Sequence, residues 1–182
     1  SINGAKLATR TGNVILLKDL FAQAIEKVYQ ITGEKNPDMP EEKKHEIAEK
    51  VGVGAIVFYY LSNNRIKDIN FMLEDALSYD GNTGPYVQYT YARCCGILEK
   101  AGDFTKCGKI TEDAECNIIK TLGLFPEKVE QARRELEPSV ISRYLLDVCA
   151  EFNRFYHDCP VLKAEDEEIR NTRLTIVKAA SI

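Results

Sequence analysis

The sequence predicts a mainly α-helical protein, and three features point to this class. Prolines, glycines and acidic first turns divide the 182 residues into segments of helical length. Within most segments the apolar residues recur every three or four positions, which is the spacing of one helix face. With 45% hydrophobic and 29% charged residues, the composition is that of a globular chain that can bury a core. Only two short runs, 14–17 and 67–71, are also compatible with a strand or an extended connection.

Two helices are expected in the first part of the chain. The first begins near Asp19 and ends near Gly33, ahead of a loop, 34–40, that contains two prolines. The second begins near Glu41, where acidic side chains interact favourably with the helix dipole. Its expected apolar stripe is Ile47, Val51, Gly54, Phe58 and Leu61. Because a glycine within a helix costs about 1 kcal/mol, Gly54 predicts the close approach of another backbone.

The stretch 78–93 (SYDGNTGPYVQYTYAR) is the densest signal in the chain. Its glycines and Asn82 predict a turn, because these residues tolerate positive φ. Pro85 suits the first position of a helix that runs to about Ala101. One predicted face of this helix is apolar and comprises Val87, Tyr91, Cys94 and Leu98. The neighbouring face carries Tyr86, Tyr89 and Arg93. These three side chains form either the flank of a core or a surface for stacking flat groups.

Further helices make a bundle of four or five from Pro85 onward. One begins near 111–115 and ends near Gly123, the next begins at Pro126, and the last begins at 165–168. The strongest amphipathic pattern begins at Pro138 and ends before Pro160. Its stripe comprises Ile141, Tyr144, Leu145, Val148, Phe152, Phe155, Tyr156 and Cys159. We expect Tyr144, Phe152 and Phe155 to be core residues. Tyr91, in the helix that begins at Pro85, is also expected in the core.

Charge, hydropathy and cysteine spacing exclude several functions. No apolar run reaches the roughly 18 residues of a membrane span, and no signal-peptide pattern opens the chain. A soluble, cytoplasmic protein without a membrane partner is therefore expected. The net charge of −4 does not favour DNA or another polyanion, although a local patch can act against it. The six cysteines form no C-x-x-C pair and have no histidine at zinc-site spacing, so reduced thiols and no metal site are expected.

No catalytic group is expected in this chain. Both histidines, His45 and His157, fall on polar faces of predicted helices, and no serine or cysteine lies in a nucleophile elbow. The acidic clusters at 41–42 and 165–168 are better explained as helix N-terminal charges than as acid–base pairs. Residues 9–13 (TRTGN) allow two interpretations: a loop that holds phosphate oxygens, or a solvated basic loop.

Two segments resemble the arginyl-tRNA synthetases. Residues 7–13 (LATRTGN) are similar to a degenerate form of the Lys-Met-Ser-Lys-Ser loop, which contacts the ATP phosphates in this class of enzyme. Residues 81–93 (GNTGPYVQYTYAR) are similar to the segment by which the same enzymes enter their helical anticodon-binding domain. Shorter pieces extend the resemblance over nearly the whole chain, namely 51–55, 137–138, 144–145, 155–156 and 173–174.

The resemblance implies a chain of two parts. Residues 1–84 would be the tail of a class I catalytic domain with connecting helices, and 85–182 an anticodon-binding helical bundle cut off before its final helices. The ATP-binding loop would contain Thr9, Arg10, Thr11 and Gly12, with Arg10 in place of the second lysine but without the usual Met-Ser pair. The positions that face the tRNA anticodon loop would be Tyr86, Tyr89, Arg93 and Tyr156.

The implied parent enzyme joins L-arginine to its tRNA through an arginyl-adenylate, using ATP with Mg²⁺, and is expected to be a monomer. The His-Ile-Gly-His signature of that family is absent from these 182 residues, so this chain alone should bind tRNA without charging it. A stacking surface needs few basic residues, so the net charge of −4 is compatible with this role. Two alternatives remain: a non-catalytic synthetase-like module that binds RNA or protein, and a helical scaffold whose tyrosines are all core.

Overall fold

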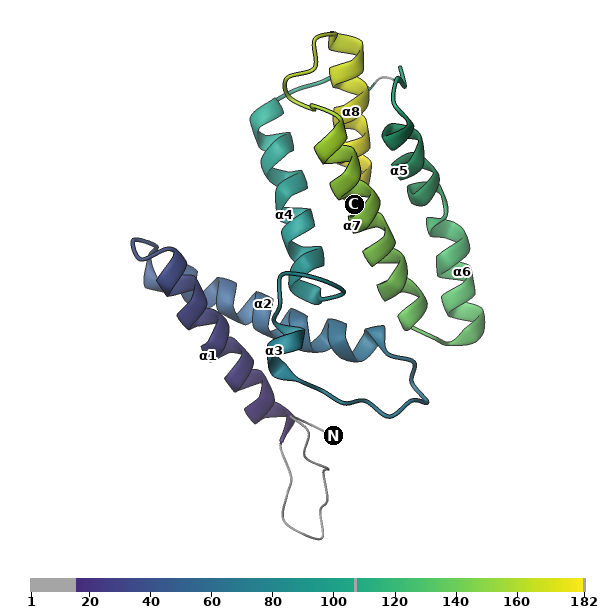
Figure 1. Ribbon diagram of the computed structural model, residues 1–182. Coiled ribbons are helices and arrows are strands. Elements are labelled where there is room, and N and C mark those ends of the chain that lie inside the picture. Colours follow the sequence, from purple (N-terminus) through teal and green to yellow (C-terminus); the bar gives the residue numbers. More distant parts are fainter. Residues whose placement is uncertain (1–15, 107, 182) are drawn as a thin grey trace. The chain divides into compact units, whose positions relative to one another are not determined.

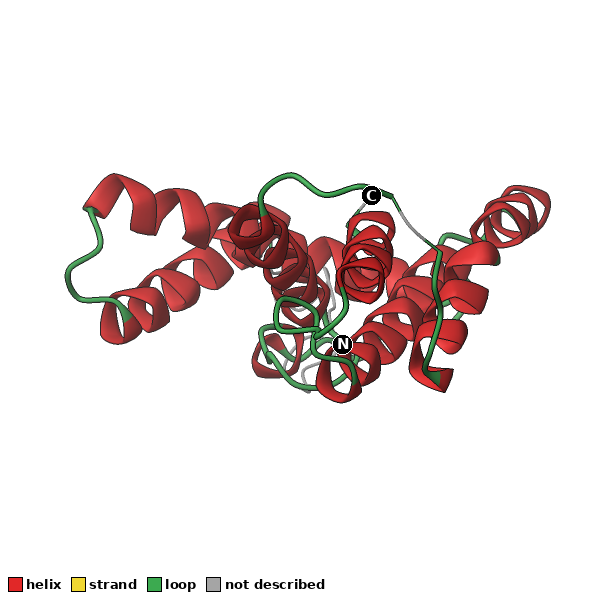
Figure 2. Cartoon of the chain, turned by 90° about the horizontal axis from the view of Figure 1, so that it is seen from above, coloured by secondary structure: helices red, strands yellow, loops and turns green. Residues whose placement is uncertain are grey.

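The chain is mainly α-helical, as the sequence predicts. The computed structural model describes residues 16–106 and 108–181, and within these ranges it contains eight helices and no strand (Figure 1; Figure 2). The chain forms two compact units, Ser1–Tyr86 and Val87–Ile182. The first contains α1 (Leu17–Lys35), α2 (Glu41–Ser62) and α3 (Leu73–Ala76), and α4 (Gly84–Ala101) begins at its end. The second adds α5 (Asp113–Gly123), α6 (Phe125–Glu135), α7 (Ser139–Asp158) and α8 (Glu167–Ala180).

Helices α1 and α2 of the first unit pack closely against each other. Their shared core contains Leu20, Ala24, Val28, Ala48, Ala55 and Ile56. The two backbones meet at Gly52, where a Cβ atom would lie 2.9 Å from the backbone nitrogen of Ile25. The predicted stripe of α2 is wrong at Leu61, which is exposed, and it omits Gly52. A second backbone does come close beside Gly54, as predicted, because a Cβ atom on Gly84 would lie 3.0 Å from the Gly54 carbonyl oxygen. Small residues form the contact between α1 and α2, and a pattern of large apolar side chains does not include them.

The segment 67–71 is an extended connection, which was one of its two predicted states. It ends at Phe71, whose side chain is fully buried. The Phe71 ring lies edge-on to Tyr59 with ring centres 4.9 Å apart and stacks on Tyr60 at 5.6 Å. The connection thus anchors itself to α2 through one aromatic side chain.

The core of the second unit is built from α4, α5, α7, α8 and the segment after α7. Its buried residues are Cys94, Ile97, Ile118, Tyr144, Val148, Phe152, Phe155, Cys159, Val161, Leu174, Ile176 and Val177. The prediction that Tyr144, Phe152 and Phe155 are core residues is confirmed.

The predicted apolar face of α4 is right at Cys94, which is buried, and at Leu98, which packs on the core, but it is wrong at Tyr91. In the second unit its buried residues are Thr90, Cys94 and Ile97, whereas Tyr91 is 56% exposed, so the prediction of a core tyrosine at this position is wrong. Thr90 occupies the core position because its side chain is hydrogen-bonded to Cys149, which satisfies the hydroxyl group on burial. Tyr91 instead lies at the surface and is hydrogen-bonded to Cys95.

A buried ion pair joins α5 to α8. Arg173 Nε donates to Glu115 Oε1 over 2.6 Å, and both side chains are almost inaccessible. Glu115 Oε2 accepts from the N–H groups of Thr111 and Glu112, and Arg173 Nη1 donates to the carbonyl oxygen of Pro160. Burial raises the pKa of Glu115, but the hydrogen bonds from Arg173 and the two backbone N–H groups outweigh it and hold the pKa below its ordinary value.

The described cysteines carry free thiols. Cys94, Cys149 and Cys159 are buried, Cys116 is partly buried and Cys95 is exposed. Burial raises the pKa of Cys94 to about 12 and that of Cys159 to about 11, so both thiols stay protonated at neutral pH.

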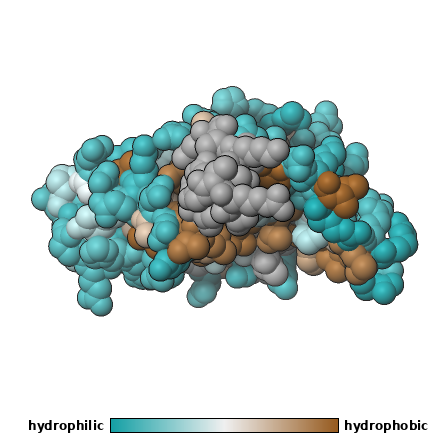
Figure 3. Space-filling model, turned by 90° about the horizontal axis from the view of Figure 1, so that it is seen from below, coloured by the Kyte–Doolittle hydropathy of each residue, from teal (hydrophilic) through white to brown (hydrophobic). Residues whose placement is uncertain are grey.

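Within the described ranges, no helix is both long and apolar enough to cross a membrane. Some apolar side chains nevertheless reach the surface, and Figure 3 shows hydrophobic residues between hydrophilic ones on one face of the molecule. The exposed apolar residues of the second unit include Leu124, Phe125 and Leu136. Leu136 ends α6 with a φ of 50°, a left-handed conformation that a glycine more often adopts.

Candidate nucleic-acid interface

Helices α4 and α7 bring one cation and two tyrosines together at the surface of the second unit. The guanidinium carbon of Arg93 lies 4.7 Å from the ring centre of Tyr89 and 4.9 Å from that of Tyr156. Both distances are within the roughly 6 Å range of a cation–π interaction. Tyr89 and Arg93 are one helical turn apart on α4, whereas Tyr156 lies on the last turn of α7. Tyr89, Arg93 and Tyr156 are called the Tyr–Arg cluster below.

Two hydrogen bonds hold the Arg93 side chain in place. Its Nη1 donates to Asn153 Oδ1 over 2.7 Å, and its Nη2 donates to the hydroxyl oxygen of Tyr89 over 2.9 Å. Asn153 lies three positions before Tyr156, so α7 supplies both an aromatic ring and an anchor for the cation. The plane of the guanidinium is therefore oriented by the protein itself.

The Tyr156 ring is supported from the core. It stacks on Phe152 with ring centres 6.3 Å apart and ring planes 12° from parallel, and Phe152 is fully buried. Tyr156 is 42% exposed and Tyr89 is 52% exposed. The hypothesis that all the tyrosines are core residues is therefore wrong. The cluster is a surface feature in which Phe152 supports the Tyr156 ring and both tyrosine side chains remain partly accessible.

This arrangement suits a single-stranded nucleic acid. Unpaired bases are held on aromatic rings and on guanidinium planes, and a guanidinium also hydrogen-bonds phosphate oxygens. A rigid cation between two rings offers both kinds of contact in one place, because the flat faces suit bases and the remaining N–H groups suit oxygen acceptors.

The remaining predicted site residues are Tyr86 and the four residues of the ATP-binding loop. Tyr86 belongs to the first unit and is half-buried, and its backbone N–H donates to the Thr83 hydroxyl at the start of α4. The predicted ATP-binding residues Thr9, Arg10, Thr11 and Gly12 lie outside the described residues. Asn153 was missed by sequence reasoning, because no local signal pairs a polar residue on α7 with an arginine on α4.

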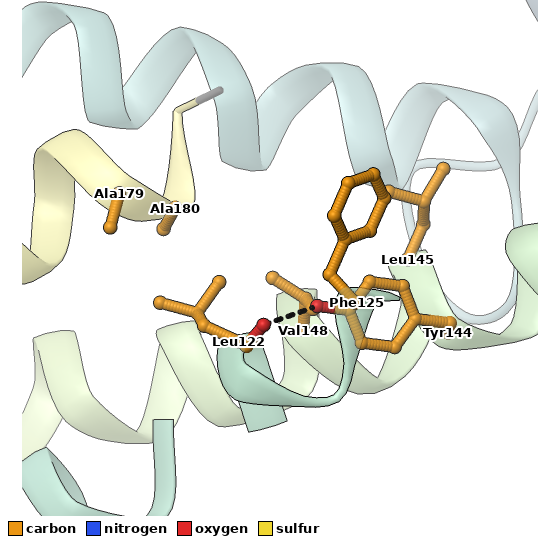
Figure 4. Close-up of a pocket in the computed structure, with 7 residues that line it drawn as sticks. All are labelled: Leu122, Phe125, Tyr144, Leu145, Val148, Ala179 and Ala180. Carbon is orange, nitrogen blue, oxygen red and sulfur yellow. Dashed lines mark hydrogen bonds between the residues drawn. The ribbon is translucent and has the colours of Figure 1, made fainter. Parts of the chain in front are cut away.

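A second surface feature differs from the cluster in its chemistry. A hollow of about 390 Å³ lies between α7, the junction of α5 with α6, and the end of α8 (Figure 4). It is lined by Leu122, Phe125, Tyr144, Leu145, Val148, Ala179 and Ala180. The Tyr144 hydroxyl donates to the carbonyl oxygen of Leu122 over 3.2 Å. Since this lining contains no charged side chain, the hollow does not suit a polyanion.

Two family sequence patterns match the chain. The DALR anticodon binding domain matches residues 87–182, which is more than half of the chain. The catalytic domain described as "tRNA synthetases class I (R)" matches residues 2–73. Among the curated relatives, the arginine--tRNA ligase of Alkaliphilus metalliredigens is 46% identical over 180 residues, and that of Clostridium beijerinckii is 44% identical over 178. These alignments cover 97% and 96% of this chain but only 31% of each relative.

Solved structures show the same similarity. The arginyl-tRNA synthetase of Thermus thermophilus matches 99% of this chain with a TM-score of 0.90 and 34% identity. The arginyl-tRNA synthetase of Plasmodium falciparum matches 92% with a TM-score of 0.80 and 22% identity, which shows the fold alone. The chain spans 31% of the length of each of these structures.

Proposed function

This chain belongs to the DALR anticodon binding domain family, in the form that arginyl-tRNA synthetases carry, and on that premise we propose that its second unit binds the anticodon loop of an arginine tRNA. The observation that supports this role most directly is the exposed Tyr–Arg cluster. Anticodon bases are unpaired and can turn outward, which makes them suitable partners for tyrosine rings and a guanidinium.

The energetics of this binding rest more on stacking than on net charge. Each base stacked on an aromatic ring contributes about 1–3 kcal/mol. Tyr89 and Tyr156 would hold bases, and the charge of Arg93 would stabilise the neighbouring phosphates. Because Asn153 and Tyr89 already orient Arg93, little side-chain entropy is lost when the RNA binds. This explains how a chain with a net charge of −4 can bind a polyanion.

The longer protein that the relatives imply would join L-arginine to its tRNA in two steps. Arginine would first react with ATP, with Mg²⁺ present, to form arginyl-adenylate, and the arginyl group would then pass to the tRNA. In this scheme residues 1–84 are the tail of the catalytic domain, and Thr9, Arg10, Thr11 and Gly12 contact the ATP phosphates. The present chain alone would bind tRNA without charging it. We expect the longer enzyme to act as a monomer in the cytoplasm.

A tRNA titration tests the binding role. Filter binding would compare a transcript of an arginine tRNA with the same transcript carrying substituted anticodon bases. We expect the unsubstituted transcript to bind more tightly. A transcript in which an anticodon nucleotide is abasic should bind about 5- to 150-fold more weakly for each lost stacking contact, which corresponds to about 1–3 kcal/mol. Equal affinity for both transcripts would contradict anticodon recognition and would favour a synthetase-like module with another partner.

A further inference from the structure

A hollow of about 430 Å³ adjoins the Tyr–Arg cluster. It lies between α4, the end of α7 and the segment that follows α7. Its lining residues are Ile97, Tyr156, His157, Pro160, Val161, Leu162 and Lys163. Tyr156 belongs to both the cluster and the hollow, so the two features are continuous at the surface of the second unit. The volume falls within the range of small-ligand pockets, which is about 300–1,000 Å³.

The lining of the hollow consists of buried apolar residues and exposed polar residues. Ile97 and Val161 are 6% and 5% exposed and form part of the core. Tyr156 supplies an aromatic wall, while the side chains of His157 and Lys163 are exposed at the rim. Lys163 has no salt-bridge partner among the residues that the structure describes. The carboxylate of Asp158 lies beside His157, since its Oδ1 is 2.7 Å from His157 Nδ1.

We propose that this hollow binds one nucleotide of the RNA, next to the nucleotide that stacks on the Tyr–Arg cluster. The base lies against Tyr156, Ile97 and Val161, and its phosphate group is bound by Lys163. This inference rests on the proposed tRNA-binding function and extends it from a stacking surface to a defined pocket for a neighbouring nucleotide.

The chemistry of the lining favours a nucleotide over an apolar peptide. A nucleotide combines a flat, largely apolar nucleobase with an anionic phosphate. The hollow combines aromatic and aliphatic walls with an exposed lysine. The hollow beside Phe125 and Tyr144 contains no such cation. A strand that crosses the Tyr–Arg cluster also reaches this hollow without a gap, because Tyr156 lines both.

The test uses Lys163→Gln, with Lys120→Gln as the matched control, since Lys120 is an exposed lysine of the same unit that does not line the hollow. Filter binding of an arginine tRNA transcript is measured between 0.1 and 1 M salt. One lost phosphate contact makes the slope of log K against log salt shallower by about 0.7, which is about fivefold in affinity over that salt range. We expect this change for Lys163→Gln and wild-type behaviour for Lys120→Gln.

A second measurement locates the base. Transcripts in which one anticodon-loop nucleotide at a time is abasic are titrated against the wild type and Lys163→Gln. We expect a position, distinct from the one affected by Tyr89→Ala, at which removal of the base weakens wild-type binding about 5- to 150-fold.

The outcomes separate this proposal from the proposed function. If Lys163→Gln keeps the wild-type affinity and salt slope while Tyr89→Ala weakens binding, the hollow does not bind RNA and the cluster still does. A hollow that binds a peptide instead of RNA would also leave the tRNA affinity of Lys163→Gln unchanged, and this outcome would contradict the proposal. If the wild type does not distinguish arginine tRNA from its anticodon-substituted form, the proposed function itself fails.

Discussion

Arg93 on α4 donates a hydrogen bond of 2.7 Å to Asn153 on α7, and this contact holds the Arg93 guanidinium against the rings of Tyr89 and Tyr156. The two residues are 60 positions apart in the chain. The hydrogen bond links the helix that carries Tyr89 to the helix that carries Tyr156. The geometry of the candidate interface therefore depends on the packing of α4 with α7.

Replacing Tyr89 by alanine should weaken binding without weakening the fold. Because the ring is 52% exposed, Tyr89→Ala should cost about 1–3 kcal/mol of tRNA affinity and leave the melting temperature nearly unchanged. Tyr91→Ala is the matched control, since Tyr91 is similarly exposed, at 56%, on the same helix but lies outside the cluster. Filter binding and thermal unfolding check both variants. A large drop in Tm for Tyr89→Ala, with affinity lost only in proportion, would mean that the residue is structural.

Asn153 should act as a positioning residue for Arg93. In a double-mutant cycle with Arg93→Ala and Asn153→Ala, tRNA affinity should show a coupling energy of about 0.5–3 kcal/mol, because the hydrogen bond is lost in either variant. Asn117→Ala replaces an exposed asparagine on α5 and should show no coupling to Arg93. Additive effects of Arg93→Ala and Asn153→Ala would show that Asn153 does not orient the cation.

The Glu115–Arg173 pair should make stability depend on pH in the acidic range. The folded state lowers the pKa of Glu115 below its unfolded value of about 4.3, so the unfolded chain binds more protons between these two values. The stabilisation is present above the unfolded pKa and is lost as the pH falls through the folded pKa. Urea unfolding of Glu115→Gln at pH 3–7 should show lower stability at pH 7 and a weaker pH dependence below about pH 4.3 than the wild type.

Two controls define that experiment. Glu99→Gln changes an exposed glutamate on α4 and should follow the wild-type curve. Arg173→Ala leaves Glu115 buried without its cation and should cost about 3–5 kcal/mol at neutral pH. Parallel curves for the wild type and Glu115→Gln would show that the pair makes no pH-dependent contribution.

The contact between α1 and α2 should be sensitive to a single methyl group. Gly52→Ala places a Cβ 2.9 Å from the backbone nitrogen of Ile25, so the helices must separate, at a cost of about 1–3 kcal/mol. Gly33→Ala, in α1, has no atom within 4 Å of the new methyl group and should stabilise the chain by about 0.5–1 kcal/mol. Denaturant unfolding of the two variants should give opposite signs. Equal stabilities would contradict the close approach.

Arg10 should affect activation of arginine and not tRNA binding. In the longer enzyme, loss of the Arg10 charge should slow ATP-dependent formation of arginyl-adenylate by about 100-fold or more, since a preorganised cation stabilises charge on the phosphates. Pyrophosphate exchange measures activation, and filter binding measures tRNA affinity. Lys18→Ala serves as the control, since Lys18 is an exposed lysine on α1 outside this loop. Equal exchange rates for Arg10→Ala and the wild type would contradict the role in the ATP loop.

Much of the helical pattern was predictable because it depends on local spacing. The stripe that includes Tyr144, Phe152 and Phe155 correctly predicted the core of the second unit. Two predicted helix faces were wrong at one position each, Tyr91 on α4 and Leu61 on α2, and the reason is physical. Thr90 and Gly52 are buried through a hydrogen bond and a close backbone contact, and neither effect is visible in a pattern of large apolar residues. Tyr91, expected in the core, lies at the surface as a consequence.

The amino-acid sequence by itself determined the fold class, the family resemblance and the placement of Tyr89 and Arg93 on one face of one helix, since all three depend on residue type and short-range spacing. The resemblance also placed Tyr156 on the same surface as these two residues. Only the tertiary structure decided that Asn153 joins them, that Tyr156 contacts Arg93 and that the rings are exposed. The reason is that helices far apart in the chain meet through packing of their buried faces. Which polar side chains then become neighbours follows from how α4 and α7 pack, and local sequence carries no record of it.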